Sequence, residues 1–194
     1  MNELVNEKGQ TLAEFLAEYD LTKYDRPSVT LDNIVIAEKD GRPAVLLIKR
    51  RNHPFIGELA FPGGFLEKGE SLEDGALREL YEETGVTGVT PIQLGAYGRP
   101  GRDPRGWIVT VAFISKLPAG AVPKAADDAA DAGLYGITVH AGSITLANAE
   151  KGETISVPYG FENGRARFMP TPGIAGDHAQ ILADALLRLG MINE

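Results

Sequence analysis

The chain has 194 residues, which is long enough for one domain with its own hydrophobic core. Its hydrophobic content of 43% and charged content of 24% are ordinary for a soluble globular protein. The net charge of −8 argues against a nucleic-acid partner, because proteins that bind the phosphate backbone usually present a basic surface. The chain has no cysteine, so disulfides and thiolate metal sites are excluded.

No stretch of the sequence has the pattern of an export signal or a membrane span. Residues 1–10, MNELVNEKGQ, lack the basic segment and apolar run of a secretory signal. Nowhere do about 18 apolar residues follow one another, as a transmembrane helix requires. We therefore expect a cytoplasmic protein without a membrane partner.

Residues 11–19 predict a short amphipathic helix. Thr11 and Glu14 have the spacing of a capping box, and the apolar residues fall on one stripe. The turn formers and proline that follow make residues 1–28 an N-terminal helical extension of the main domain. An apolar stripe on an extension needs a surface to cover it. That surface is either the same domain or a partner subunit, so a homodimer is one expected assembly.

Residues 29–194 form the predicted main domain, in which strands alternate with two substantial helices. Strands are expected at 29–37, 44–49, 59–61, 92–98, 107–114, 134–139 and 143–146, and helices after Ser71 and at 177–189. Residues 120–133 look like an acidic loop. Asp177 and Gly190 are placed to cap the last helix at its two ends. This alternation indicates an α/β fold.

The helix after Ser71 carries Glu79, Glu82 and Glu83 on one face, because residues three and four apart lie together on a helix. Like charges at this spacing repel by about 0.2–0.5 kcal/mol per pair. Two explanations are open. The carboxylates hold a hard divalent cation, above all Mg²⁺, or they form a solvated acidic face.

The opposite face of that helix is expected to be buried, with Leu77, Leu80, Tyr81 and Thr84 on it. Gly75 falls on the acidic side, where alanine would favour the helix by about 1 kcal/mol. Either a neighbouring loop or ligand approaches this glycine closely, or it is a tolerated surface glycine.

The spacing G-x5-E-x7-R-E-U-x-E-E-x-G-U, with U an aliphatic residue, resembles the Nudix box. It is fulfilled without departure by Gly64, Glu70, Arg78, Glu79, Leu80, Glu82, Glu83, Gly85 and Val86. The resemblance implies a Nudix-type α/β/α sandwich with a mixed β-sheet. It also implies metal-dependent hydrolysis of a nucleoside diphosphate linked to another group, with Mg²⁺ as cofactor and Mn²⁺ as a substitute.

The resemblance also implies roles for individual residues of the box. Glu79 and Glu83 would be the principal metal ligands, and Glu82 a third or bridging one. The backbone-carbonyl ligand of the family falls on Gly63. Glu70 and Arg78 would support the catalytic loop and helix by a salt bridge rather than touch the ion.

The general base is open between two candidates. In many relatives it lies on a later acidic loop, and the stretch with Asp127, Asp128 and Asp131 occupies about that place. Spacing favours Asp128, although Ala126 and Asp131 depart from the family pattern of this loop. Glu82 acting within the box is the other catalytic option, in which case Asp128 is a solvated loop carboxylate.

A second resemblance, to ADP-ribose pyrophosphatase-like Nudix proteins, covers Tyr97–Trp107, residues 26–30 and residues 177–186. It implies cleavage of ADP-ribose to AMP and ribose 5-phosphate. Arg99, Arg102 and Arg105 are candidates for binding the substrate, because guanidinium groups suit bidentate anion recognition. The alternative is a self-contained salt-bridge turn with Asp103. Trp107 either stacks on adenine or belongs to the core.

Two other functions compete with ADP-ribose hydrolysis. One is cleavage of a different nucleotide: a nucleotide sugar, a dinucleoside polyphosphate or an oxidised nucleotide. The other is a non-enzymatic regulator, as in relatives where a Nudix domain senses ADP-ribose beside a DNA-binding winged helix. The intact box, the single clear helix after the sheet and the acidic charge all favour an enzyme without a nucleic-acid partner.

Overall fold

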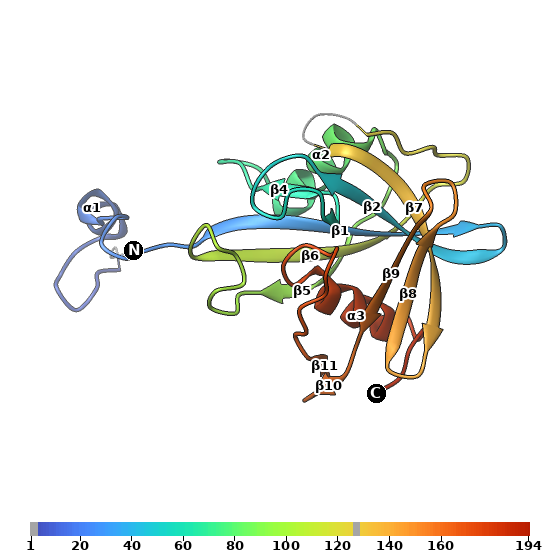
Figure 1. The fold of residues 1–194 in the computed structure, drawn as a ribbon. Helices are drawn as coiled ribbons and strands as arrows, with labels where there is room; N and C mark the ends of the chain where they lie inside the picture. Colours follow the sequence, from blue (N-terminus) through green and yellow to red (C-terminus); the bar gives the residue numbers. More distant parts are fainter. Residues whose placement is uncertain (1–3, 126–128) are drawn as a thin grey trace.

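The structure, a computed structural model, describes residues 4–125 and 129–194 (Figure 1). Its strands run as follows: β1 Ser28–Lys39, β2 Arg42–Arg50, β3 Leu59–Ala60, β4 Gly63–Phe65, β5 Ile92–Tyr97, β6 Ile108–Lys116, β7 Ala129–His140, β8 Ser143–Asn148, β9 Glu153–Pro158, β10 Phe161–Glu162 and β11 Arg165–Ala166. Its helices are α1 Leu12–Glu18, α2 Leu72–Thr84 and α3 His178–Arg188. Within the described residues, no helix is long and apolar enough to cross a membrane.

One large mixed sheet organises the molecule. Its strands follow the order β5-β6-β1-β2-β7-β8-β9, with β3 added beside β2 and β4 beside β1. The neighbours β1 and β6 run parallel, whereas β1 is antiparallel to both β2 and β4. The predicted α/β fold with a mixed sheet is therefore confirmed.

The two faces of the sheet are covered by different helices (Figure 1). Side chains alternate between faces along a strand, so neighbours in β2 point in opposite directions. Val45 and Leu47 belong to the core cluster that contains Leu182 of α3. Leu46, between them, packs in the cluster of Leu80 from α2. The sheet thus lies between α2 and α3, as an α/β/α sandwich requires.

The predicted loop at 120–133 is wrong in its last part. Strand β7 begins at Ala129 and pairs with β2, where Asp131 lies opposite Lys49. Alanine, aspartate and glycine have low intrinsic preference for strands, and pairing with a neighbouring strand decides the structure here instead. Strands β9, β10 and β11 were also not expected from the local sequence.

Helix α1 begins with the predicted capping box between Thr11 and Glu14. Figure 1 shows it away from the sheet, and no residue of the helix is buried. Its apolar stripe is exposed, with Leu12 at 70% and Leu16 at 59%. The division at residue 28 stays a proposal, and the surface that covers this stripe is taken up below.

Helix α2 has the predicted ends, with the Ser71 hydroxyl accepting from the Asp74 N–H and Gly85 in the left-handed conformation at φ 68°. The predicted helix faces need a correction. Tyr81 is 58% exposed, whereas Glu83 is only 7% exposed. Because β4 pairs with β1 and packs against α2, the buried face is rotated toward Glu83.

Gly75 is buried within α2, so the expectation of a close neighbour is confirmed. A Cβ at this position would lie 2.6 Å from Leu31 Cδ1 and 2.7 Å from Glu70 Oε1. Both distances are far below van der Waals contact. Glycine is a poor helix former, but it occupies this position because Leu31 of β1 and Glu70 lie too close for a larger side chain.

Candidate functional site

A cleft of about 410 Å³ opens beside β4 and the carboxylate face of α2. It is lined by residues of β1, β4, α2, the two loops at 50–55 and 102–105, and the start of α3. The charged side chains on its wall are Asp32, Arg50, Arg51, Glu67, Glu79, Glu82, Glu83, Arg102, Asp103, Arg105 and Asp177. Both signs of charge therefore meet in one cavity, as recognition of a charged ligand requires.

Glu83 is held where α2 meets β4. Its Oε2 accepts a 2.7 Å hydrogen bond from the Gly63 N–H. Burial raises the pKa of Glu83 to about 8, and the charge of Glu79 adds to this shift. The Gly63 hydrogen bond opposes the shift without cancelling it. A buried carboxylate with a raised pKa lacks compensating positive charge.

Glu79 lies one turn earlier against Gly64. Its side chain is 14% exposed, and burial raises its pKa although Arg78 acts in the opposite direction. A Cβ on Gly64 would overlap the Glu79 carboxylate. Glycine at this position is thus what allows the carboxylate to lie against the β4 backbone.

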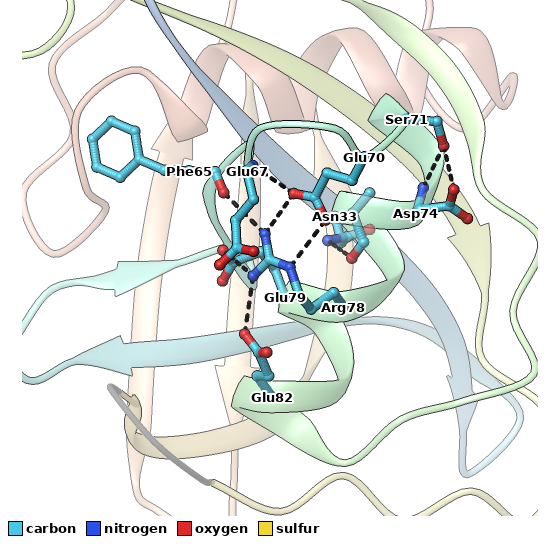
Figure 2. A network of polar contacts seen from close by, with 10 residues as sticks. Asn33, Phe65, Glu67, Glu70, Ser71, Asp74, Arg78, Glu79 and Glu82 are labelled. Carbon is cyan, nitrogen blue, oxygen red and sulfur yellow. Dashed lines mark hydrogen bonds and ion pairs between the residues drawn. The ribbon is translucent and has the colours of Figure 1, made fainter.

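Arg78 is the centre of the network that holds the box together. Figure 2 shows Glu70, Glu79, Glu82 and the Phe65 carbonyl directed at its guanidinium group. Glu70 accepts twice, at 2.8 and 3.1 Å, while Glu79 and Glu82 accept at 2.8 and 3.0 Å. The hydrogen bond from Arg78 lowers the pKa of Glu70. This geometry matches the supporting role expected for Glu70 and Arg78.

The carboxylates suit a hard divalent cation, although they are not yet gathered round one point. Within the described residues, no three His, Asp or Glu side chains already form a metal site. The Arg78 guanidinium group donates to Glu79 and Glu82, while the Gly63 N–H donates to Glu83. Among the described residues, Glu79 Oε2 and Glu83 Oε1 make no hydrogen bond, so one oxygen of each carboxylate is left for an ion. Hard oxygen donors with excess negative charge are the ligands that Mg²⁺ and related ions prefer.

The arginine loop that follows β5 is tied down by two ion pairs. Arg102 is buried and donates to Asp177 at 2.8 Å from Nε and 2.7 Å from Nη2. Arg105 pairs with Asp103 at 2.7 Å, which is the salt-bridge turn considered above. Arg102 and Arg105 line the cleft.

The third arginine of this loop has an aromatic partner. The Arg99 guanidinium carbon lies 3.9 Å from the centre of the Phe168 ring. This cation–π packing occupies one face of the guanidinium group and holds Arg99 against Phe168.

The remaining predicted residues have different placements. Asp128, together with Asp127, lies outside the described residues. Asp131 is in β7, where Lys151 Nζ contacts its carboxylate. Trp107 is 59% exposed, so the expectation that it belongs to the core is wrong. It directly precedes β6, which begins at Ile108, so its side chain lies at the end of that strand rather than inside it.

Two cleft residues were missed by sequence reasoning. Asp32 of β1 and His178 of α3 line the cavity, with Asp32 Oδ1 3.7 Å from His178 Nε2. A lone aspartate inside a β-branched strand was the available signal for Asp32, because a buried carboxylate needs a partner. His178 gave no signal beyond its place after the Asp177 cap.

The comparisons with known proteins agree with this geometry. A family model described as NUDIX domain matches residues 29–141. The ADP-ribose pyrophosphatase of Methanocaldococcus jannaschii is 42% identical over 125 residues, which cover 63% of this chain and 71% of that protein. A MutT/nudix family protein from Enterococcus faecalis superposes with a TM-score of 0.79 and 34% identity, covering 95% of this chain and 71% of that chain.

A further solved structure is the NUDIX domain of Shewanella oneidensis NrtR in complex with ADP ribose. Its TM-score is 0.68 at 31% identity, and the match covers 93% of this chain and 99% of that chain. The family match spans more than half of the chain and includes β4, α2 and every residue of the box. The chain therefore belongs to the Nudix hydrolase family.

Proposed function

We propose that this protein hydrolyses ADP-ribose to AMP and ribose 5-phosphate, with Mg²⁺ or Mn²⁺ as its cofactor. The observation that carries the proposal is the placement of the buried Glu83 and the partly buried Glu79, one turn apart on α2, in a cleft that also presents arginines. The choice of substrate is supported by the two similar proteins whose names include ADP-ribose.

Glu79 and Glu83 are the proposed principal ligands of the divalent ion, with Glu82 and the Gly63 carbonyl completing the protein's share. When bound, such an ion neutralises the diphosphate charge and lowers the pKa of water. Arg78 Nη1 bridges Glu79 and Glu82, while Glu70 and the Phe65 carbonyl hold the guanidinium group in place. Gly64 leaves the space in which Glu79 lies.

The general base is proposed to be Asp128, with Glu82 as the alternative. One carboxylate oxygen of Glu82, Oε2, already accepts a hydrogen bond from Arg78, which favours Asp128. Asp128→Asn and Glu82→Gln separate the two. The variant of the true base should lose kcat with little change in metal affinity.

Among the arginines, Arg105 is the proposed contact to the substrate, because it lines the cleft and its side chain is 39% exposed. Its guanidinium carbon lies 4.9 Å from the centre of the Phe65 ring, and Asp103 accepts from its Nε and Nη2, so the Nη1 group is the donor left for an anion. Arg102 is proposed as a positioning residue, because Asp177 occupies two of its donor positions. Arg99, packed on Phe168, is proposed to stabilise the loop.

A substrate panel with product analysis tests the function. ADP-ribose, ADP-glucose, diadenosine polyphosphates and 8-oxo-dGTP are compared at equal concentration with Mg²⁺. Release of AMP and ribose 5-phosphate from ADP-ribose, faster than cleavage of the others, supports the proposal. If another nucleotide is cleaved faster than ADP-ribose, the protein is instead assigned to that substrate class.

Binding of ADP-ribose without hydrolysis is the second candidate function, favoured by the match to the NrtR Nudix domain. The same panel separates the two, because a sensor binds ADP-ribose yet releases no AMP. A gel-shift assay then decides whether such a sensor acts on DNA. We expect no shift, because the net charge of −8 opposes binding to phosphates.

The N-terminal extension is proposed to pair with a second copy of the chain, giving a homodimer. The support is the apolar stripe on α1, which stays exposed at Leu12, Phe15 and Leu16. Size exclusion of the full chain and of a variant lacking residues 1–24 provides the test. If the full chain and the truncated variant elute with the same number of chains per particle, the proposed role of the extension in a dimer is contradicted. The cytoplasmic location also stays a prediction.

A further inference from the structure

The cleft continues past the carboxylates of α2 to the face of the sheet that α3 covers. Asp32 and His178 lie there, and neither has a part in the proposed metal site. From their geometry we propose that Asp32 and His178 together bind the vicinal hydroxyls of a ribose in the substrate. This inference rests on the proposed function and identifies the part of the substrate that this end of the cleft recognises.

The hydrogen bond to His178 Nδ1 fixes the proton on its imidazole ring. The Phe61 N–H donates to Nδ1 at 3.0 Å, which requires an unprotonated lone pair on that nitrogen. Burial lowers the pKa of His178, so the ring is neutral near pH 7. The proton of the neutral ring is then on Nε2. Stacking on the Phe61 ring, with centroids 5.1 Å apart, holds this orientation.

The carboxylate of Asp32 is likewise fixed on one side and open on the other. Thr110 Oγ1 donates to Oδ2 at 2.6 Å from the adjacent strand β6. The other oxygen, Oδ1, lies 3.7 Å from His178 Nε2, which is too long for a hydrogen bond. The two side chains are only 10% and 13% exposed, and both line the cleft. Neither group is held in place by the other.

His178 Nε2 is thus a donor and Asp32 Oδ1 an acceptor, and the two atoms lie next to each other. Phe61 holds the histidine and Thr110 holds the aspartate. A hydroxyl group donates and accepts at once, so two neighbouring hydroxyls satisfy both protein groups. A phosphate cannot donate to Asp32, and its charge would be repelled by the carboxylate. A carboxylate that accepts from ribose hydroxyls is a recurrent way of binding nucleotides.

The other charged groups at this end leave the pair available. Arg102 and Asp177 neutralise each other through their two hydrogen bonds. Arg50, whose charge acts on His178, donates from Nε to the Pro54 carbonyl. The carbonyl leaves the charge of Arg50 in place, so the phosphates are assigned to the metal-binding carboxylates, Arg50 and Arg105, and the sugar to Asp32 and His178.

A matched pair of substitutions at His178 separates the ligand role from the structural one. The amide oxygen of His178→Asn can replace Nδ1 as acceptor for the Phe61 N–H, but no donor remains at the position of Nε2. His178→Gln places an amide nitrogen near Nε2 and loses the acceptor. Asp32→Asn removes the acceptor charge. Asp103→Asn, another cleft aspartate, serves as control.

The experiment compares kcat/KM for ADP-ribose with that for two analogues, one lacking the 2-hydroxyl of the terminal ribose and one lacking the 2′-hydroxyl of the adenosine. The wild-type protein should prefer ADP-ribose to one analogue by about tenfold or more, since a site built to bind a hydroxyl rejects its absence. Asp32→Asn and His178→Asn should reduce this preference to about twofold or less. His178→Gln and Asp103→Asn should keep most of it.

Binding of the non-hydrolysable α,β-methylene ADP-ribose is measured in parallel, with thermal unfolding as a check of folding. If the wild-type protein neither binds this analogue nor releases AMP, the proposed function and this inference are both overturned. If it does both and Asp32→Asn keeps the same hydroxyl preference while folded, the inference alone is wrong. If Asp32→Asn or His178→Asn does not fold, the wild-type protein and the milder variant Asp32→Glu provide the test. A wild-type protein that prefers ADP-ribose to neither analogue overturns the inference. A wild-type preference that is lost in Asp32→Glu supports it.

Discussion

Asp177 binds Arg102 through both carboxylate oxygens, at 2.7 and 2.8 Å, in a buried pair that joins the loop after β5 to the start of α3. The sequence suggested a different use for each residue. Asp177 was expected to cap α3, yet its side chain makes no capping hydrogen bond. Arg102 was expected to bind substrate. Each residue instead satisfies the charge and hydrogen-bonding groups of the other. This pair fixes the loop that carries Arg105 and the start of α3, where His178 lies.

The Arg102 pair predicts a large loss of stability on removal of one partner. Asp177→Asn or Arg102→Gln leaves a buried charge without its partner, which typically costs about 3–5 kcal/mol of unfolding free energy. Urea denaturation of the purified variants measures the loss. Arg105→Gln is the matched control, because its pair with Asp103 is more exposed and should contribute about 0–1 kcal/mol. Equal losses at both arginines would show that Arg102 is not a structural anchor.

The glycine pair in β4 predicts two separable defects. In Gly64→Ala the new methyl group displaces the Glu79 carboxylate, the end of a flexible side chain, so the fold should survive. Activity should fall by about a hundredfold, as expected when a catalytic group is displaced by an ångström or so. In Gly63→Ala the methyl group meets the Leu31 carbonyl in the β1 backbone, so stability should fall as well.

Steady-state kinetics and thermal unfolding of both glycine variants provide the measurement. Full activity in Gly64→Ala would contradict the proposed position of Glu79. Unchanged stability in Gly63→Ala would contradict the close pairing of β4 with β1, in which Asp32 lies opposite Gly63.

The raised pKa of Glu83 predicts a pH dependence of stability in the presence of a chelator. Its folded pKa of about 8 lies above the ordinary value of 4.5, so folding favours the protonated form. The stabilisation is fully present below about pH 4.5 and is lost as the pH rises through about 8, by on the order of a few kcal/mol. Glu83→Gln should show a flatter profile between pH 5 and 9.

The proposed divalent ion would bind the ionised form of Glu83, so it should restore stability most at high pH and release a proton on binding near pH 7. Denaturation curves with EDTA and with Mg²⁺ at several pH values check both statements. A Glu83→Gln profile parallel to that of the wild-type protein would show that another group carries the dependence, Glu79 and Asp184 being the other acids whose pKa burial raises.

Local sequence rules predicted the parts of the fold that depend on local chemistry. The ends of α2 follow from Ser71 and Gly85, because a hydroxyl cap and a left-handed glycine act within one turn. The turn between β1 and β2 obeys a rule of the same kind, because Asp40 and Gly41 form a favourable hairpin pair and both have positive φ. The spacing of Glu79, Glu82 and Glu83 likewise places these three residues within α2.

The parts that were missed depend on contacts between distant segments. Strand β7 begins at Ala129 because β2 offers it a partner, and Glu83 is buried because β4 covers that side of α2. Asp32 and His178 are far apart in sequence and meet only because the sheet and α3 pack together. No local pattern could reveal that the Asp177 carboxylate would turn away from its helix to bind Arg102.

The most direct test of the proposed activity is AMP release from ADP-ribose before and after removal of divalent ions. The wild-type protein should lose turnover in EDTA and regain it with added Mg²⁺ or Mn²⁺. Glu79→Gln and Glu83→Gln should show little turnover under all conditions while unfolding cooperatively. Turnover by the wild-type protein that is unaffected by EDTA would contradict a metal site built on these two carboxylates.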